Sequence, residues 1–223
     1  PSDELLRRLW PGRSILANRL YFGRRPAERG MRWFDYAIYF GDRNSRPYRI
    51  SFPNVSTHNH FALDRGGNSF SSTAPLIVMP VGATEQLHLS LLAVLNSSVA
   101  AFWIKQVSHN KGSTMDSRGA RQTQEPWEDF YQVTGTKLES FPLPEELPGE
   151  IGARLDGRAQ CLADRAPAVG LGHVPIALLS RDWRAEWELE LAAMIFLQEE
   201  LDWAVYGAYG LLDDLGHFVQ VAE

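Results

Sequence analysis

The sequence contains a single cysteine, Cys161, among 223 residues. One cysteine excludes an internal disulfide framework and is typical of a reducing compartment, so we expect a cytoplasmic protein. No run approaches the roughly 18–20 uninterrupted apolar residues of a membrane span, and no secretory segment precedes the first elements, so no membrane partner is expected. The chain begins at Pro1 rather than at Met, from which we expect a fragment or a processed product.

The usual catalytic motifs are also missing. There is no glycine-rich phosphate loop of the P-loop or dinucleotide-binding kind, and Gly66-Gly67 alone is a turn signal. No Ser-His-Asp or Cys-His arrangement can be argued from spacing. His58 and His60 could ligate a metal, but no third ligand has convincing spacing. The sequence therefore predicts no catalytic residue, no cofactor site and no metal site on this chain.

Charge is distributed unevenly along the chain. The formal net charge is −5, but residues 1–137 carry a balance of +6 and residues 138–223 a balance of −11. Residues 1–50 contain eleven arginines, no lysine and five acidic residues. Arginine pairs bidentately with phosphate and with guanine. This asymmetry favours polyanion binding by the first part of the chain, with an ordinary solvated surface as the alternative.

A polar segment of about twenty residues follows the mostly apolar run 91–104, and loops of that length are usually functional or disordered. Its side chains suit DNA, with cations for phosphates or guanine and amides for base edges. The segment 108–124 is therefore the main candidate for DNA contact, and the run 58–60 is the second; a solvated loop without function is the alternative. The candidate DNA-binding residues are His109, Asn110, Lys111, Ser113, Thr114, Arg118, Arg121, Gln122, His58, Asn59 and His60.

The pattern of apolar and polar residues predicts an α+β fold, with a small mixed sheet and packed helices followed by a helical C-terminal region. Ser2 and Thr84 are expected to cap helices at 2–10 and 84–107. Short extended runs are predicted at 15–22, 33–40, 48–55, 58–63 and 76–81, a hairpin between 48 and 63, a turn at 65–68, a strand at 137–144, helices at 145–164 and 182–209, and a linker at 166–175. In the last helix, burial is expected for Leu189, Ile195, Leu197, Leu201 and Trp203, either within the chain or against a domain that is absent from it.

Several segments of this chain resemble the C-terminal part of large adenine-specific DNA methyltransferases. They are VSTHNHFALDRGGNSFSSTAPLIVMP at 55–80, LLAVLNSSVAAFW, QVSHNKGST, GARQTQEPWEDFYQVTGTKLESFPLP and FLQEELDWAVYGAYGLL at 196–212. Among these enzymes, the segments resemble the PglX methyltransferases of BREX phage-defence systems and, more distantly, single-chain type IIG restriction–modification enzymes. The resemblance covers roughly residues 30–215. The order of helix and strand is also similar to target-recognition domains of type I specificity subunits.

The resemblance implies that this region reads DNA sequence, while an N-terminal domain binds S-adenosylmethionine and transfers the methyl group. The family's catalytic Asn-Pro-Pro-Tyr motif is absent here, because Asn54 follows Pro53 but precedes Val55. By itself the chain is therefore not expected to be catalytic, and S-adenosylmethionine is expected only for the parent enzyme. We expect a DNA target-recognition domain at 1–148 and a helical region at 149–223.

The expected partners are double-stranded DNA and the N-terminal methyltransferase domain of the same parent protein. The acidic helices are expected to face away from DNA and to pack on that domain or on a partner. Two alternatives remain open. One is a protein-interaction module that binds another defence protein or a phage inhibitor, and the other is a free-standing specificity subunit that acts in trans.

Overall fold

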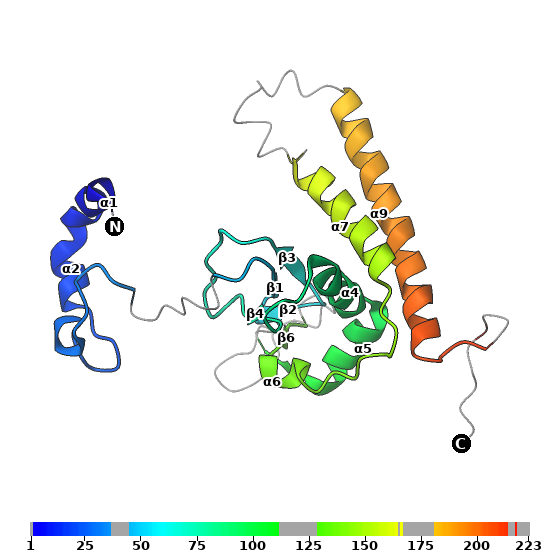
Figure 1. Cartoon of the computed structure of the whole chain (residues 1–223), viewed down its shortest axis with the longest axis horizontal. Coiled ribbons are helices and arrows are strands. Elements are labelled where there is room, and N and C mark those ends of the chain that lie inside the picture. Colours follow the sequence, from blue (N-terminus) through cyan, green and yellow to red (C-terminus); the bar gives the residue numbers. More distant parts are fainter. Residues whose placement is uncertain are drawn as a thin grey trace. The chain divides into compact units, whose positions relative to one another are not determined.

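The computed structural model describes residues 2–36, 45–111, 129–164, 166, 181–213 and 217. The chain divides into two compact units, Pro1–Ser45 and Arg46–Glu223, which are described separately (Figure 1). The predicted α+β class is confirmed. Among the described residues, the strands are divided between two three-stranded antiparallel sheets rather than gathered in one mixed sheet.

The first unit consists of short helices: α1 (Asp3–Leu9), the 3₁₀ helix η1 (Trp10–Gly12), α2 (Arg13–Asn18) and the 3₁₀ helix η2 (Ala27–Arg29). Ser2 caps α1 as predicted, because its hydroxyl accepts a hydrogen bond from the Leu5 amide at 3.3 Å. The extended run predicted at 15–22 is wrong for its first half. Leu16 and Ala17 are strong helix formers, and α2 continues directly from η1.

Only Pro26 is buried among the described residues of this unit. Residues 33–36, the described part of the run predicted at 33–40, lie in turns and a bend rather than in a strand. Trp33 contacts Trp10 edge to face, with ring centroids 6.1 Å apart. Aromatic contacts of this kind therefore hold together a unit that has almost no buried core.

The second unit contains both sheets. The first has the order β3-β1-β4, built from β1 (Arg49–Ser51), β3 (Ala62–Asp64) and β4 (Leu76–Ile77). β1 pairs with β3 in the register Ile50↔Leu63, which confirms the predicted hairpin between 48 and 63. The predicted turn is also confirmed, since Gly66 and Gly67 have φ values of 90° and 82°, which L side chains rarely adopt. Ile50 is fully buried in the core beneath this sheet.

The second sheet has the order β2-β6-β5, built from β2 (Val55–Ser56), β5 (His109–Asn110) and β6 (Tyr131–Gln132). Both outer strands pair with β6 in antiparallel orientation. The Val133 amide extends the sheet by donating to the Asn54 carbonyl at 2.9 Å. Val133 is buried in the same core as Ile50, so the two sheets share one apolar interior.

The single helix predicted over 84–107 is two helices, α4 (Glu85–Leu95) and α5 (Ser98–Val107). Thr84 caps α4 as predicted, and Ser97 caps α5 by accepting from the Ala100 amide at 3.3 Å. The apolar spacing continues across the break, so periodicity alone could not locate it. Among the described residues no single helix is long and apolar enough to cross a membrane; α4 and α5 meet the requirement only as a pair, bent by 65°.

The strand predicted at 137–144 is wrong. Its first residues belong to a short helix, α6 (Gly135–Leu138), and the rest has no regular structure. Pro142 and Pro144 have no amide to donate to a ladder, which disfavours a paired strand there. Phe141 is nevertheless buried, and its ring centroid lies 5.1 Å from that of Trp103. The segment therefore contributes to the core without forming a strand.

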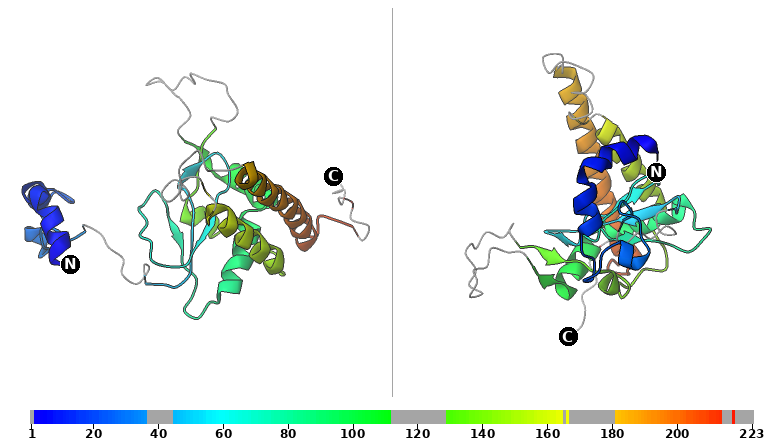
Figure 2. Two further views of the ribbon diagram at one scale, coloured as in Figure 1. Left: turned by 90° about the horizontal axis from the view of Figure 1, so that it is seen from above. Right: turned by 90° about the vertical axis from the view of Figure 1, so that its left-hand side faces the viewer.

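Two long helices complete the second unit, α7 (Gly149–Asp164) and α9 (Arg181–Ala208), close to the predicted bounds. α7 packs against both α4 and α9 (Figures 1 and 2). Leu197, Leu201 and Val205 bring α9 into the core. Leu189, Ile195 and Trp203 are exposed on this chain, so they are not buried within it, and their burial against an absent domain stays a prediction. The predicted linker at 166–175 lies outside the described residues except for Ala166.

The helical region from residue 149 is not separate from what precedes it, because α7 packs on α4 inside one compact unit. The compact units divide instead at residue 45. The predicted boundary at 148 is a division by function, and it stays a prediction. Structurally, the helices from 149 onward complete the core on which both sheets rest.

The α4–α7 contact depends on Gly152, where a methyl group would lie 2.6 Å from the Leu89 carbonyl oxygen and 2.8 Å from the Ala93 Cβ. Gly152→Ala should therefore push α7 from α4 and cost about 1–3 kcal/mol. A methyl group at Gly157 in the same helix would have no atom within 4 Å, so Gly157→Ala should stabilise by about 0.5–1 kcal/mol. Urea unfolding of both variants measures these effects, and equal changes would contradict the close packing.

Candidate nucleic-acid interface

The second sheet brings the two predicted DNA-contacting segments together. β2 and β5 flank β6, with Val55 and His109 both opposite Gln132, and Ser56 and Asn110 both opposite Tyr131. Because both outer strands are antiparallel to β6, they run in the same direction. The chain therefore leaves β2 toward His58 and leaves β5 toward Lys111 at the same end of the sheet.

Three predicted residues, His109, Asn110 and Lys111, lie on or beside β5, and all three are exposed. The Lys111 amide donates to the Phe130 carbonyl at 2.7 Å and lengthens the pairing by one residue. Its ammonium donates to Gln132 Oε1 at 3.2 Å. Such an exposed contact is weak, so the ammonium can readily leave Gln132 and bind a phosphate instead.

The Asn110 side chain has a stronger competitor for DNA. Its Nδ2 donates to Asp129 Oδ1 at 2.9 Å. A base contact by this amide must therefore displace Asp129, and the carboxylate itself repels phosphate. The predicted residues Ser113, Thr114, Arg118, Arg121 and Gln122 lie outside the described residues. The described residues on either side, Lys111 and Phe130, are the hydrogen-bonded pair at the end of the sheet.

His58 and His60 lie in an irregular segment between β2 and β3 rather than on a strand face. Both are exposed, and their ring centroids are 4.0 Å apart. The pKa of His58 is lowered from its ordinary value by partial burial, then by the neighbouring His60 and by Lys105 of α5. Two imidazoles and one ammonium thus gather in one region, where the Lys105 ammonium supplies positive charge and the imidazole N–H groups can donate to an anion.

Lys105 was not predicted as a site residue. It ends the apolar run of α5 and is exposed, and a basic residue in the last turn of a helix has the ordinary role of complementing the helix dipole. Its proximity to His58 depends on how α5 packs beside the 57–60 segment, which spacing in the sequence does not reveal. Among the residues that the structure describes, no three His, Cys, Asp or Glu side chains come together as a possible metal site.

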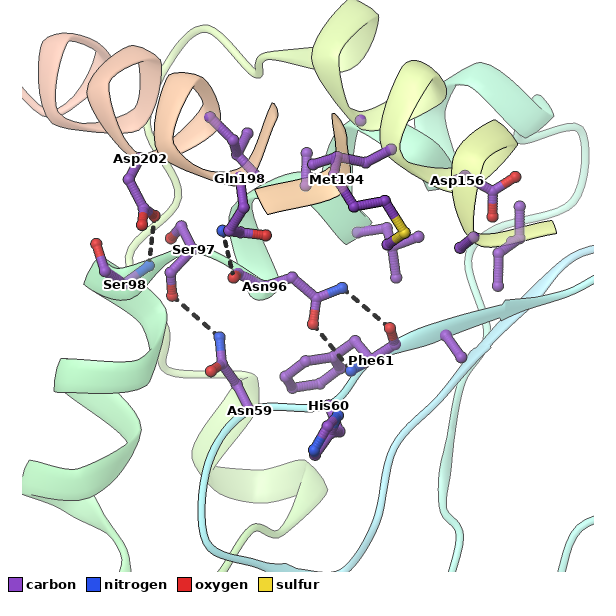
Figure 3. Close-up of a pocket in the computed structure, with 18 of the residues that line it drawn as sticks. Asn59, His60, Phe61, Asn96, Ser97, Ser98, Asp156, Met194, Gln198 and Asp202 are labelled. Atoms are coloured by element: carbon purple, nitrogen blue, oxygen red, sulfur yellow. Dashed lines mark hydrogen bonds between the residues drawn. The ribbon is translucent and has the colours of Figure 1, made fainter. Parts of the chain in front are cut away.

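Asn59 has a structural use. Its Nδ2 donates to the Leu95 carbonyl at 2.8 Å and to the Ser97 carbonyl at 3.0 Å, on either side of the α4–α5 break (Figure 3). Reading adenine bidentately requires a free amide group with both Nδ2 and Oδ1 available. If the predicted DNA contact of Asn59 is such a reading of adenine, these two bonds must first break.

The α4–α5 break is the centre of a polar network. Asn96 Oδ1 accepts from the Phe61 amide at 3.0 Å, and Asn96 Nδ2 donates to the Phe61 carbonyl at 2.9 Å. Asp202 of α9 accepts from the Ser98 amide at 2.7 Å, and Gln198 donates to the Asn96 carbonyl at 3.2 Å (Figure 3). The α4–α5 break thereby holds the 59–61 segment on one side and α9 on the other.

A half-open cavity of about 520 Å³ lies beside this network. Leu92, Leu155 and Met194 give it apolar walls, and His60 and Gln198 also line it. The side chains of Asn59 and Asn96, which line it as well, are already hydrogen-bonded within the fold. The cavity therefore offers mainly apolar surface.

The arginines of the basic first part are not all available to DNA. Arg49 is fully buried, and its side chain donates to Asp64 and to the Asn68 carbonyl. Arg65 bridges Glu85 and Asp156. In the first unit, by contrast, guanidinium groups lie over aromatic rings at the surface, and these pairs are Arg13 with Trp10, Arg29 with Tyr21 and Arg32 with Phe34. Counting arginines by sequence thus overestimates the charge that can meet phosphate.

No family model matches the chain. A curated protein described as adenine-specific methyltransferase PglX, from Streptomyces coelicolor, is 46% identical over 206 residues. The match covers 91% of this chain and 17% of that relative. The predicted resemblance is confirmed, and the chain corresponds to a region of that much longer protein.

Proposed function

We propose that this chain is the DNA-recognition region of an adenine-specific DNA methyltransferase of a phage-defence system. Its similarity to a region of the adenine-specific methyltransferase PglX supports the proposal. Methyl transfer from S-adenosylmethionine then takes place outside this chain, and the whole enzyme works on DNA in the cytoplasm. The residues of this chain bind, orient and discriminate the DNA.

The observation that carries the proposal is the common end of the β2-β6-β5 sheet. Lys111 follows β5 there, and His58 and His60 follow β2. Lys105, close to His58, adds a second ammonium to that of Lys111, and the imidazoles offer N–H donors. Cations at one end of a sheet neutralise phosphates and fix the register of the duplex. Base edges are then read by side chains of the 108–124 segment, above all Arg118 and Arg121.

Charge supports an orientation for the remainder of the chain. Residues 138–223 carry a balance of −11, and their helices α7 and α9 form the acidic part of the second unit. DNA repels such a surface. In the proposed complex the duplex therefore meets the end of the sheet, and the acidic helices face other protein.

Lys111→Ala should weaken binding of the chain to every duplex sequence alike. It removes one phosphate contact, so the dependence of log affinity on log salt should fall in slope by about one. Fluorescence anisotropy with a labelled duplex across a salt series measures both quantities. Arg184→Ala is the matched control, because it also removes one exposed positive charge but lies on α9. An unchanged slope for Lys111→Ala, or an equal change for Arg184→Ala, would contradict the proposed surface.

Sequence reading is tested by a chimera. The matched 206-residue region of the Streptomyces coelicolor PglX is replaced by this chain, and methylated sites are scored across the host genome. The chimera should methylate a motif different from that of the parent. Arg118→Ala or Arg121→Ala, if either meets guanine, should then cost roughly 1–3 kcal/mol on the cognate motif only. A chimera that keeps the parental motif places recognition outside this chain.

A further inference from the structure

Helix α9 exposes a continuous apolar stripe. Leu189, Phe196 and Trp203 are seven residues apart, and they are 71%, 58% and 49% exposed. Ala192 lies on the same stripe, and Ile195, which is 55% exposed, lies beside it. A spacing of seven places side chains in nearly one line along a helix and is typical of helix–helix seams. The stripe extends over four turns of α9.

The stripe is separate from the face that packs into the core. Leu197, Leu201 and Val205 point to the core and are buried, whereas Phe196 lies about 100–180° around the helix from them. A surface helix of a soluble domain ordinarily has one apolar face, and a helix that is apolar on several sides is covered on several sides. The second apolar face of α9 is therefore a surface for another protein segment.

The charges beside the stripe are acidic. Glu188, Glu199 and Glu200 are exposed on the outer side of α9, and its two arginines, Arg181 and Arg184, lie in the first turn. A second copy of the helix would place carboxylates against carboxylates over most of the seam, which is unfavourable. A helix with an apolar stripe between Lys and Arg residues is the complementary partner.

We propose that the outer face of α9 docks a basic amphipathic helix from the methyltransferase part of the longer protein; the inference rests on the proposed function. The chain spans only 17% of its PglX relative, so such a protein has ample further polypeptide to supply this helix. Docking through α9 places the acidic side of this chain against protein and leaves the end of the β2-β6-β5 sheet for DNA.

The test uses the Streptomyces coelicolor PglX without its matched region as the probe and this chain as its partner. The wild-type chain should bind the probe in calorimetry, more weakly at high salt. The double substitution Leu189→Glu and Phe196→Glu should weaken binding at least about tenfold, since it buries two carboxylates in the seam. Val81→Glu is the control, because Val81 is also an exposed apolar residue, at 81%, and is remote from α9 in sequence.

Circular dichroism verifies that the variants fold. Absence of binding by the wild-type chain, or an equal loss for Val81→Glu, would overturn the proposal. So would a dimer of the wild-type chain in light scattering that the double substitution dissociates, because a second copy would then cover the stripe. The affinity of the chain for DNA distinguishes failure of the docking proposal from failure of the proposed function. It should respond to Lys111→Ala and not to the α9 substitutions.

Discussion

Replacing the buried Arg49 by methionine should destabilise the second unit by about 3–5 kcal/mol, because Asp64 is left as an uncompensated buried charge. The two side chains are 0% and 3% exposed, and Arg49 Nε donates to Asp64 Oδ2 at 2.8 Å. Asn68 Nδ2 donates to the other carboxylate oxygen at 2.6 Å. The pair also joins β1 to β3, so its loss loosens the hairpin as well.

The measurement is urea unfolding at neutral pH, with Arg65→Met as the control. Arg65 is 39% exposed and pairs with Glu85, 37% exposed, and with Asp156, 9% exposed, so its replacement should cost less than that of the fully buried Arg49. Arg49→Met combined with Asp64→Leu should recover much of the loss, since replacing both partners by apolar groups is often neutral. If Arg49→Met lowers the free energy of unfolding by less than Arg65→Met does, the buried pair contributes little to stability.

Acid adds a second readout of the same pair. Burial acts to raise the pKa of Asp64, but hydrogen bonds from Asn68 and Arg49 outweigh it, and the pKa of this carboxyl is lowered. A lowered carboxyl pKa stabilises the fold above the ordinary value near 3.8, and this stability is lost as the pH falls through the lower folded pKa. Arg49→Met raises the pKa of Asp64, so the variant should lose less of its remaining stability on acidification than the wild type.

Leu201→Ala should cost about 2–5 kcal/mol, because Leu201 is fully buried where α9 enters the core. Trp203, two residues later, is 49% exposed, and Trp203→Ala should cost clearly less in this chain. Thermal or urea unfolding of the two variants shows which substitution destabilises the chain more. A larger loss for Trp203→Ala would show that the outer face of α9 is packed against this same chain in solution.

Local features were predictable from the sequence, and distant contacts were not. The caps Ser2 and Thr84 and the hairpin of β1 and β3 depend on neighbouring residues, and all were predicted. The α4–α5 break was missed because it depends on Asn59, on Phe61 and on α9, which are remote in sequence from Asn96. The apolar pattern of α9 predicted a packed helix, but it could not tell which apolar residues meet the core and which face outward.

The candidate interface follows the same division. Residue chemistry suggested both candidate segments for DNA contact, but only the pairing of β2 and β5 with β6 brings them to one end of a sheet. Arg49 was counted among the cations available to phosphate, although Asp64 holds it in the interior. Lys105 follows the apolar run 91–104, and nothing in the sequence around it indicates a site residue. Spacing in the sequence cannot show which charged side chains are buried and therefore cannot reach a phosphate.

The hydrogen bonds around Asn96 distinguish the residues that attach the 57–61 segment from the residues whose identity can vary. Asn59 and Asn96 hold the 57–61 segment by hydrogen bonds to main-chain groups, so the attachment does not depend on the identities of His58 and His60. Substitutions at 58, 60 and 109–124 therefore leave that attachment intact. We expect related proteins to diverge in the DNA motif they read by varying these exposed positions, while both asparagines stay fixed.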